Sequence, residues 1–132
     1  MTTETNETLG AHFSGIDHIE INVNDMETMA NFLKKVGFVE TRRTGHTDGS
    51  IELRFPGGPD APILELNQSM NEPKGFQHLA LRAKDIEAAF AEVQKSGLKL
   101  LRPLGPALSS GRRVFNIEDP QGNKLQVSTK ID

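Results

Sequence analysis

The sequence contains no cysteine, no tryptophan and no tyrosine, and its only aromatic side chains are those of seven phenylalanines. The absence of cysteine excludes disulfides, a thiolate nucleophile and cysteine-ligated zinc or iron–sulfur centres. The absence of tyrosine and tryptophan removes phenolic acids and indole stacking surfaces. Any chemistry must therefore come from His, Asp, Glu, Lys, Arg, Ser, Thr and amide side chains.

The chain also lacks a surplus of basic residues and a long apolar run. Its net charge of -3 and isoelectric point near 5.8 argue against a nucleic-acid-binding protein. No apolar run approaches the roughly 18 residues that a membrane span requires, and the N-terminal segment has neither the basic start nor the apolar stretch of a signal peptide. The 132 residues are enough for one domain with its own core. We therefore expect a cytoplasmic single-domain protein.

An internal repeat organises the chain. Residues 16–40 align without gaps with residues 76–100, at an offset of 60 residues. The identical pairs are His18/His78, Asp25/Asp85, Glu27/Glu87, Lys35/Lys95 and Gly37/Gly97. Each copy begins with a period-2 apolar alternation typical of a strand, continues with an Asp helix cap and an amphipathic helix, and reaches a glycine that favours the end of the helix. Further strand patterns follow each helix.

The repeat predicts an α+β domain made of two βαβββ modules. We expect strands at residues 38–44, 50–55 and 61–67 in the first half, and at 98–103, 112–118 and 124–129 in the second. The expected divisions are a polar N-terminal leader at 1–14, the first module at 15–67, a linker at 68–75 and the second module at 76–130.

Four side chains at repeat-equivalent positions share the polar face of the predicted strands: His18, Glu65, His78 and Gln126. Two imidazoles, one carboxylate and one amide oxygen suit a divalent Zn, Ni, Co, Mn or Fe ion. A lone histidine on a strand is more often a solvated residue on the wet face of an antiparallel sheet. The equivalence of all four positions favours a metal site instead.

Glu20 lies two residues after His18 on the same predicted face, about 7 Å along the strand. A carboxylate beside a metal and away from bulk water is a candidate general base. The competing interpretation is an ion pair with Arg82, which occupies the related face one repeat later.

Several arginines are candidate substrate contacts. Arg54 alternates with apolar residues on the third strand, as does Glu52, so both are expected to line the cavity. Arg112 and Arg113 lie in a run before the seventh strand and could hold a carboxylate or phosphate, but the sequence favours a solvated strand end over that role. His46 falls in a loop and is expected at the surface.

The chain resembles the vicinal oxygen chelate superfamily, which includes glyoxalase I, methylmalonyl-CoA epimerase, extradiol dioxygenases, and fosfomycin- and bleomycin-resistance proteins. The resemblance covers roughly residues 14 to 130 and rests on IDHIEINVND, ILEL, FQHLALRAKDIEAAF and EDPQGNKLQV. It implies paired modules that curl into a half-barrel around a metal, with His18, Glu65, His78 and Gln126 at the family's ligand positions. It also implies a homodimer, which the open sheet edges independently favour.

The sequence departs from the family pattern at three informative positions. Most metal-dependent relatives have Glu where this chain has Gln126. Methylmalonyl-CoA epimerases read His, Gln, His, Glu, whereas this chain reads His, Glu, His, Gln. Glyoxalase I enzymes typically have Arg and Asn, both contacting glutathione, at the positions of Asn22 and Ser69. A glutathione thioester is therefore disfavoured as the substrate.

Together these features predict a metal-dependent lyase, or an isomerase or epimerase, acting on a small oxygenated substrate through a metal-stabilised enediolate. Glu65 or Glu20 would move the proton. We expect the substrate contacts to be Arg82, Arg54, Asn22 and Arg113. Two alternatives remain open: an Fe(II)-dependent dioxygenase on the same scaffold, and a non-catalytic protein that binds or sequesters a small molecule.

Overall fold

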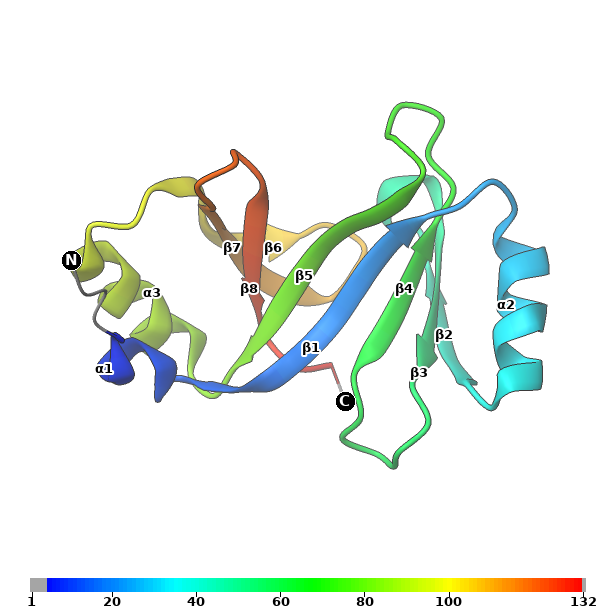
Figure 1. Ribbon diagram of the computed structural model, residues 1–132, viewed down its shortest axis with the longest axis horizontal. Helices are drawn as coiled ribbons and strands as arrows, with labels where there is room; N and C mark the ends of the chain where they lie inside the picture. The colour runs from blue at the N-terminus through cyan, green and yellow to red at the C-terminus, as the bar shows by residue number, and fades with distance from the viewer. Residues whose placement is uncertain (1–4, 132) are drawn as a thin grey trace.

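The computed structural model describes residues 5–131, which form one eight-stranded sheet with helices on its outer side (Figure 1). The first half contains β1 (Phe13–Asn22), α2 (Met26–Val36), β2 (Val39–Thr44), the 3-10 turn η1 (His46–Asp48), β3 (Ser50–Arg54) and β4 (Ile63–Asn67). The second contains β5 (Gly75–Ala83), α3 (Ile86–Ser96), β6 (Leu100–Ala107), β7 (Arg112–Glu118) and β8 (Lys124–Ser128). A short helix, α1 (Glu7–Gly10), precedes both halves.

The two βαβββ halves join at a central seam formed by β1 and β5. The strand order is β2-β3-β4-β1-β5-β8-β7-β6, with β1 and β5 antiparallel to each other. Each of them pairs in parallel with the last strand of its own half, β4 or β8. The order is therefore the same in both halves when read outward from the seam, and the predicted α+β fold of two modules is confirmed.

The helices begin and end where the sequence predicts. The Asp25 and Asp85 carboxylates accept hydrogen bonds from backbone N–H groups in the first turns of α2 and α3. Gly37 and Gly97 end the helices in the left-handed conformation, at φ 120° and 79°. Each helix covers one half of the sheet, so the opposite, inner face is left for polar residues (Figure 1).

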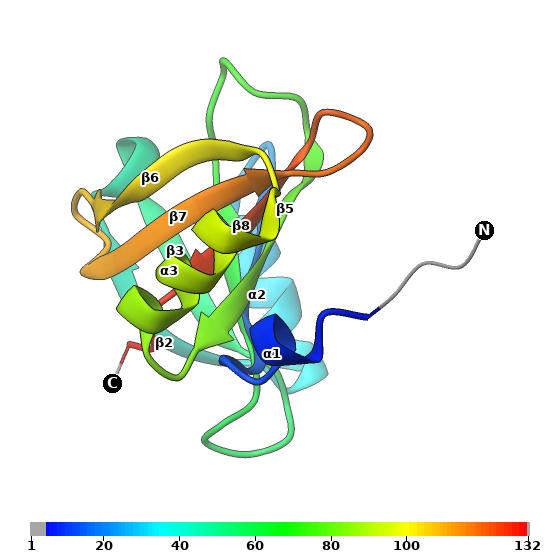
Figure 2. The same ribbon diagram turned by 90° about the vertical axis from the view of Figure 1, so that its left-hand side faces the viewer.

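Two separate hydrophobic cores lie between the helices and the sheet. The first consists of Ala30, Leu33, Ile51, Leu53, Leu64 and Leu66; the second includes Ile86, Ala89, Val93, Phe115, Ile117 and Val127. Figure 2 looks onto the second core, with β6 and β7 curving over α3 and α1 beside it. The two cores lie apart, one beneath α2 and one beneath α3, and the inner face at the seam between them holds polar side chains.

The structure differs from the sequence prediction at the N-terminus and in β6. Part of the expected polar leader is folded: Leu9 in α1 is buried against the second core, while residues 1–4 lie outside the described residues. The strand expected at residues 98–103 is longer than predicted and continues as β6 through Gly105 and Pro106 to Ala107. A proline is tolerated there because β6 is an edge strand, where a missing N–H breaks no ladder. No helix within residues 5–131 is long and apolar enough to cross a membrane.

Candidate metal and catalytic site

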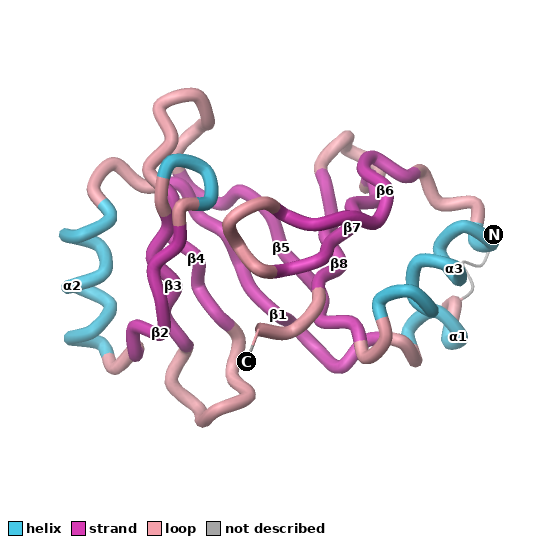
Figure 3. Tube along the Cα trace, turned by 180° about the vertical axis from the view of Figure 1, so that it is seen from behind, coloured by secondary structure: helices cyan, strands magenta, loops and turns pink. Residues whose placement is uncertain are grey.

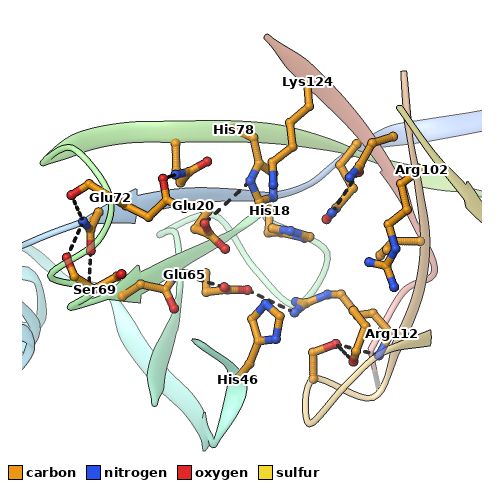
Figure 4. A pocket seen from close by; sticks show the side chains of 18 residues that line it. His18, Glu20, His46, Glu65, Ser69, Glu72, His78, Arg102, Arg112 and Lys124 are labelled. Atoms are coloured by element: carbon orange, nitrogen blue, oxygen red, sulfur yellow. Dashed lines mark hydrogen bonds and ion pairs between the residues drawn. The ribbon is translucent and has the colours of Figure 1, made fainter. Parts of the chain in front are cut away.

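A polar cavity of about 190 Å³ lies on the inner face of the sheet, across the seam (Figure 4). The four predicted donors His18, Glu65, His78 and Gln126 line it, and each is at most 7% exposed. They come from β1, β4, β5 and β8, which are neighbours in the sheet. Residues up to 108 positions apart in sequence are thus brought to one buried place.

A β-bulge gives His18 an orienting partner. The register of β1 against β5 shifts between Ile16 and His18, so Asp17 and His18 are both buried on the inner side. Oδ2 of Asp17 lies 2.7 Å from Nδ1 of His18. A carboxylate in this position accepts the Nδ1 proton and leaves the Nε2 lone pair available to a metal. The expected strand alternation places Asp17 on the helix-covered face, so the sequence analysis missed this residue.

The charge on Asp17 is stabilised by its neighbours. Burial alone would raise the pKa of the Asp17 carboxyl, but the hydrogen bond with His18 and the charges of Arg112 and His18 hold its pKa below the ordinary value. Asp17 is therefore ionised when it faces the imidazole.

His78 has the environment expected of a metal ligand. Neither of its ring nitrogens has a hydrogen-bond partner among the described residues, although both are buried. Its ring centroid lies 5.5 Å from that of His18, with the two rings nearly perpendicular. Burial, with the nearby charge of Lys124, lowers the pKa of His78 to about 3, so the imidazole is neutral at neutral pH. Buried polar atoms without partners are costly, and a metal ion would relieve that cost.

Gln126 is held by its neighbour on β7. Its Nε2 donates to Oδ1 of Asn116 at 3.2 Å, which leaves the amide oxygen to face other groups. Because carbonyl oxygens are suitable ligands for hard or borderline cations, Gln126 fits the set in this orientation. The unpartnered imidazole of His78, the oriented imidazole of His18 and this amide oxygen together agree with a divalent ion.

Two carboxylates share the centre of the cavity. Glu20 stands opposite Glu65 in the β1–β4 register and opposite His78 in the β1–β5 register, and its Oε2 lies 3.7 Å from Nδ1 of His78. Burial and the adjacent Glu65 raise the pKa of Glu20 to about 8. Burial acts in the same direction on Glu65, but Glu20, His18 and Arg112 lower the pKa of Glu65 to about 2. Without a metal, the pair therefore carries one proton, on Glu20.

Arg112 contacts three acidic residues in and beside the site. Its Nη atoms bind both oxygens of Glu52 at 2.8 and 3.0 Å, its Nε lies 3.1 Å from Oδ2 of Asp17, and Nη1 lies 3.4 Å from Oε1 of Glu65. Arg112 thus positions both Glu65 and the partner of His18. Arg113, to which the sequence analysis assigned a substrate contact, faces the other way and pairs with Glu87 on α3 at 3.1 Å. The alternation along β7 permits only one of the two neighbours to face inward.

His46 was expected at the surface but lines the cavity. One of its ring nitrogens and the carboxylates of Glu20 and Glu65 offer atoms within 4.8 Å of one another. Its Nδ1 lies 3.0 Å from the carbonyl oxygen of Leu108, in the turn between β6 and β7 that reaches toward η1 (Figure 3). His46 therefore contacts both halves of the molecule and is an additional donor at the edge of the site.

Asn22 lines the cavity, but its amide is fully engaged. Nδ2 donates to the carbonyl oxygens of Ser69, Glu72 and Pro73, and Oδ1 accepts from the Ser69 N–H at 2.7 Å. The side chain fixes the loop between β4 and β5, which leaves it no free group for the substrate contact expected of it.

Arg82 and Arg54 lie apart from the main cavity. Both line a second cavity of about 140 Å³, which shares Arg112 with the first. Besides Arg112, the cationic side chains that line the main cavity are those of Arg102 and Lys124 (Figure 4). Sequence reasoning missed these two because their strands, β6 and β8, come together only through β7.

Comparison with known proteins agrees with this architecture. The curated relatives include the uncharacterised protein YwbC of Bacillus subtilis (strain 168), 31% identical over 118 residues that cover 84% of this chain and 94% of that protein. They also include a probable lactoylglutathione lyase of Synechocystis sp. (strain ATCC 27184 / PCC 6803 / Kazusa), 28% identical over 127 residues that cover 87% of this chain and 97% of that protein.

Solved structures of methylmalonyl-CoA epimerases share the fold. The enzyme from Mycobacterium tuberculosis superposes with a TM-score of 0.76 at 18% identity, covering 100% of this chain and 94% of that one. The enzyme from Streptomyces coelicolor in complex with 2-nitronate-propionyl-CoA gives 0.74 at 21% identity, covering 91% and 99%. Residues 15–127 match the family described as Glyoxalase/Bleomycin resistance protein/Dioxygenase superfamily. The chain belongs to this superfamily, known also as the vicinal oxygen chelate superfamily.

Proposed function

We propose that the protein is a divalent-metal-dependent isomerase or lyase that moves a proton at a carbon atom of a small oxygenated substrate. The observation that carries the proposal is the convergence of four donors on one cavity, with a buried carboxylic acid, Glu20, between them. His18, Glu65, His78 and Gln126 would hold the ion. The ion would supply Lewis-acid stabilisation of the negative charge that develops on substrate oxygens when a C–H proton leaves.

Glu20 is the proposed proton-transfer residue. It is not needed to complete the four-donor set, and it is buried beside both Glu65 and His78. A nearby cation favours the ionised form of a carboxyl group, so the ion that activates the substrate would also make Glu20 available as a base. Glu65, held in place by Arg112, is suited to remain a ligand.

Arg102 and Lys124 are the proposed substrate contacts. Their positive charges lie at the second-half side of the cavity, opposite the carboxylates of Glu20 and Glu65 (Figure 4). A substrate carboxylate would therefore be drawn to that side, which orients the carbon atom toward Glu20. The cavity of about 190 Å³ suits a compact reacting group.

The relatives support this class of reaction, since lactoylglutathione lyases and methylmalonyl-CoA epimerases are among them. Between these two, the engagement of Asn22 with the Ser69 loop argues against a glutathione adduct, because that side chain has no free group. The proposal therefore favours an acyl or hydroxy acid substrate that does not carry glutathione.

The test is solvent deuterium exchange. Protein reconstituted separately with Zn, Ni, Co, Mn and Fe would be incubated in D₂O with methylmalonyl-CoA, lactoylglutathione and a set of small 2-hydroxy and 2-oxo acids. We expect deuterium incorporation at the carbon next to the carbonyl of a substrate without glutathione, its removal by a chelator, and a large loss in Glu20→Gln. Exchange by no metal form, or exchange equal in wild type and Glu20→Gln, would refute the proposal.

A further inference from the structure

We infer that the second cavity is a binding site for a small oxyanion, a carboxylate or a phosphate, distinct from the metal-binding cavity. It lies on the far side of the Arg112–Glu52 pair and has a volume of about 140 Å³. Four arginines enter it from four different strands: Arg42 from β2, Arg54 from β3, Arg82 from β5 and Arg112 from β7.

The charges in this cavity do not balance. Four guanidinium groups face only two carboxylates, Asp17 and Glu52, among the described residues that line it. Glu52 accepts from Arg112 through both oxygens and from Arg42 at 2.9 Å. Asp17 accepts from Arg82 and Arg112, each at 3.1 Å, and also faces His18. Each of the two carboxylates is thus shared between two arginines, so the positive charge of the four side chains exceeds the negative charge of the acids that line the cavity.

The remaining donors are available to a ligand. Arg82 is 9% exposed and uses only its Nε, on Asp17. Arg54 donates from Nη1 to the carbonyl oxygen of Ala61 at 2.8 Å. Within residues 5–131, the other N–H groups of these two side chains have no protein acceptor, and the buried Nε of Arg42 likewise has no partner. Planar guanidinium forks are well suited to bind carboxylate or phosphate oxygens.

Two further acids lie nearby. Glu65 contacts Arg112, at 3.4 Å, and none of the other three arginines. Asp60 pairs with Lys130 at 3.1 Å, and Lys130, Arg82 and Arg54 lower the pKa of its carboxyl, but Asp60 is exposed and its charge is screened by solvent. Among the described residues Arg54 has no carboxylate partner and Arg82 shares Asp17 with Arg112, so an anion between Arg54 and Arg82 would supply the missing counter-charge. Arg54 and Arg82 would therefore bind an anion that is not the reacting group.

The experiment is a titration of the purified protein with inorganic phosphate, and in parallel with acetate, followed by calorimetry and thermal melting at constant ionic strength set with chloride. We expect saturable binding at millimolar concentrations and a rise in Tm. Tighter binding of phosphate would identify a phosphate site, and tighter binding of acetate a carboxylate site. Arg54→Gln should weaken binding about tenfold, since one charged donor group is lost.

Three further variants make the result specific. Arg113→Gln removes an exposed arginine that lines neither cavity and should leave the affinity unchanged. Lys124→Gln removes a cation of the main cavity, so it separates anion binding there from binding at Arg54, which this variant should retain. Arg54→Lys keeps the charge but removes the fork and should give an intermediate affinity; its melting temperature checks that the fold is intact. Non-saturable binding in the wild type, or binding lost in Lys124→Gln and kept in Arg54→Gln, would overturn the inference.

Discussion

Asp17 Oδ2 lies 2.7 Å from Nδ1 of His18, although neighbours in a regular strand point to opposite faces. The bulge in β1 produces this contact and places the carboxylate within reach of Arg82 and Arg112 as well. One side chain therefore orients a proposed metal ligand and pairs with two arginines.

Asp17→Asn should weaken metal binding about 10- to 100-fold, because the imidazole of His18 loses its charged acceptor. The free energy of unfolding should fall by about 3 kcal/mol, since Arg82 and Arg112 lose a buried counter-charge. A chelator-competition titration and urea denaturation measure the two effects. Asp60→Asn is the matched control: its carboxylate is exposed, and both quantities should stay near wild type. Equal metal affinity in Asp17→Asn and wild type would contradict the orienting role.

His78→Leu should separate stability from metal binding. In the metal-free protein it removes two buried nitrogens without partners and keeps most of the side-chain volume, so stability should rise by about 1 kcal/mol. The increase in melting temperature caused by metal should disappear. Thermal melting with chelator and with added metal checks both. An unchanged metal-induced shift would show that His78 is not a ligand.

The metal-free protein should lose stability as the pH rises from 6.5 to 8. The pKa of Glu20 rises from its ordinary 4.5 to about 8 on folding, so the folded state holds a proton that the unfolded state has released. Below pH 6.5 this trend is opposed by His78, whose pKa falls from 6.5 to about 3 on folding and whose protonation favours the unfolded state. Of these two residues, therefore, only Glu20 changes the stability between pH 6.5 and 8.

Chemical denaturation at several pH values measures this dependence. Glu20→Gln keeps an uncharged side chain of the same size and should flatten the curve between pH 6.5 and 8. If wild type and Glu20→Gln show the same slope in that range, the protonated state assigned to Glu20 is wrong.

Gln126→Glu should raise metal affinity and lower the stability of the metal-free protein. The new carboxylate joins a cavity that already holds Glu20 and Glu65, so without a cation it adds repulsion, whereas a bound ion gains a charged ligand. The metal-induced shift in Tm should therefore increase. Gln121→Glu, in the exposed turn before β8, is the control and should change neither value. A fall in metal affinity in Gln126→Glu would mean that no cation lies near Gln126.

We also predict a homodimer. The strands β2 and β6 are open edges of the sheet in the described part of the chain, and the exposed Val39 on β2 follows the exposed Val36 on α2 by three residues. Multi-angle light scattering should give twice the chain mass of 14.5 kDa. A mass of 14.5 kDa at micromolar concentration would contradict the prediction.

The repeat made much of the fold predictable. Caps at Asp25 and Asp85 and apolar alternation are local properties, and they located the helices and most strands. The equivalence of His18 and His78 placed both on the same face because their strands have the same parity. Those inferences need no knowledge of which strands pair.

For three of the site residues, the position of the side chain could not be predicted from local patterns, each for a physical reason. Asp17 faces inward because of a bulge, which a period-2 pattern does not encode. Arg112 and Arg113 differ by one residue, so the choice between them depends on the register of β7 with β8. His46 reaches the cavity from η1, where its ring meets the carbonyl of Leu108, a contact between residues that are distant in sequence.

The seam between β1 and β5 has a consequence for the handedness of the site. His18 and His78 are equivalent, but the partner of Glu20 in the other half is Ala80, which is fully buried and apolar. A symmetric pair of identical modules would carry an acid on each side of a bound molecule and would treat its two faces alike. In this cavity Glu20 stands on one side and Ala80 at the equivalent place on the other, so Glu20 reaches only one face of a bound molecule.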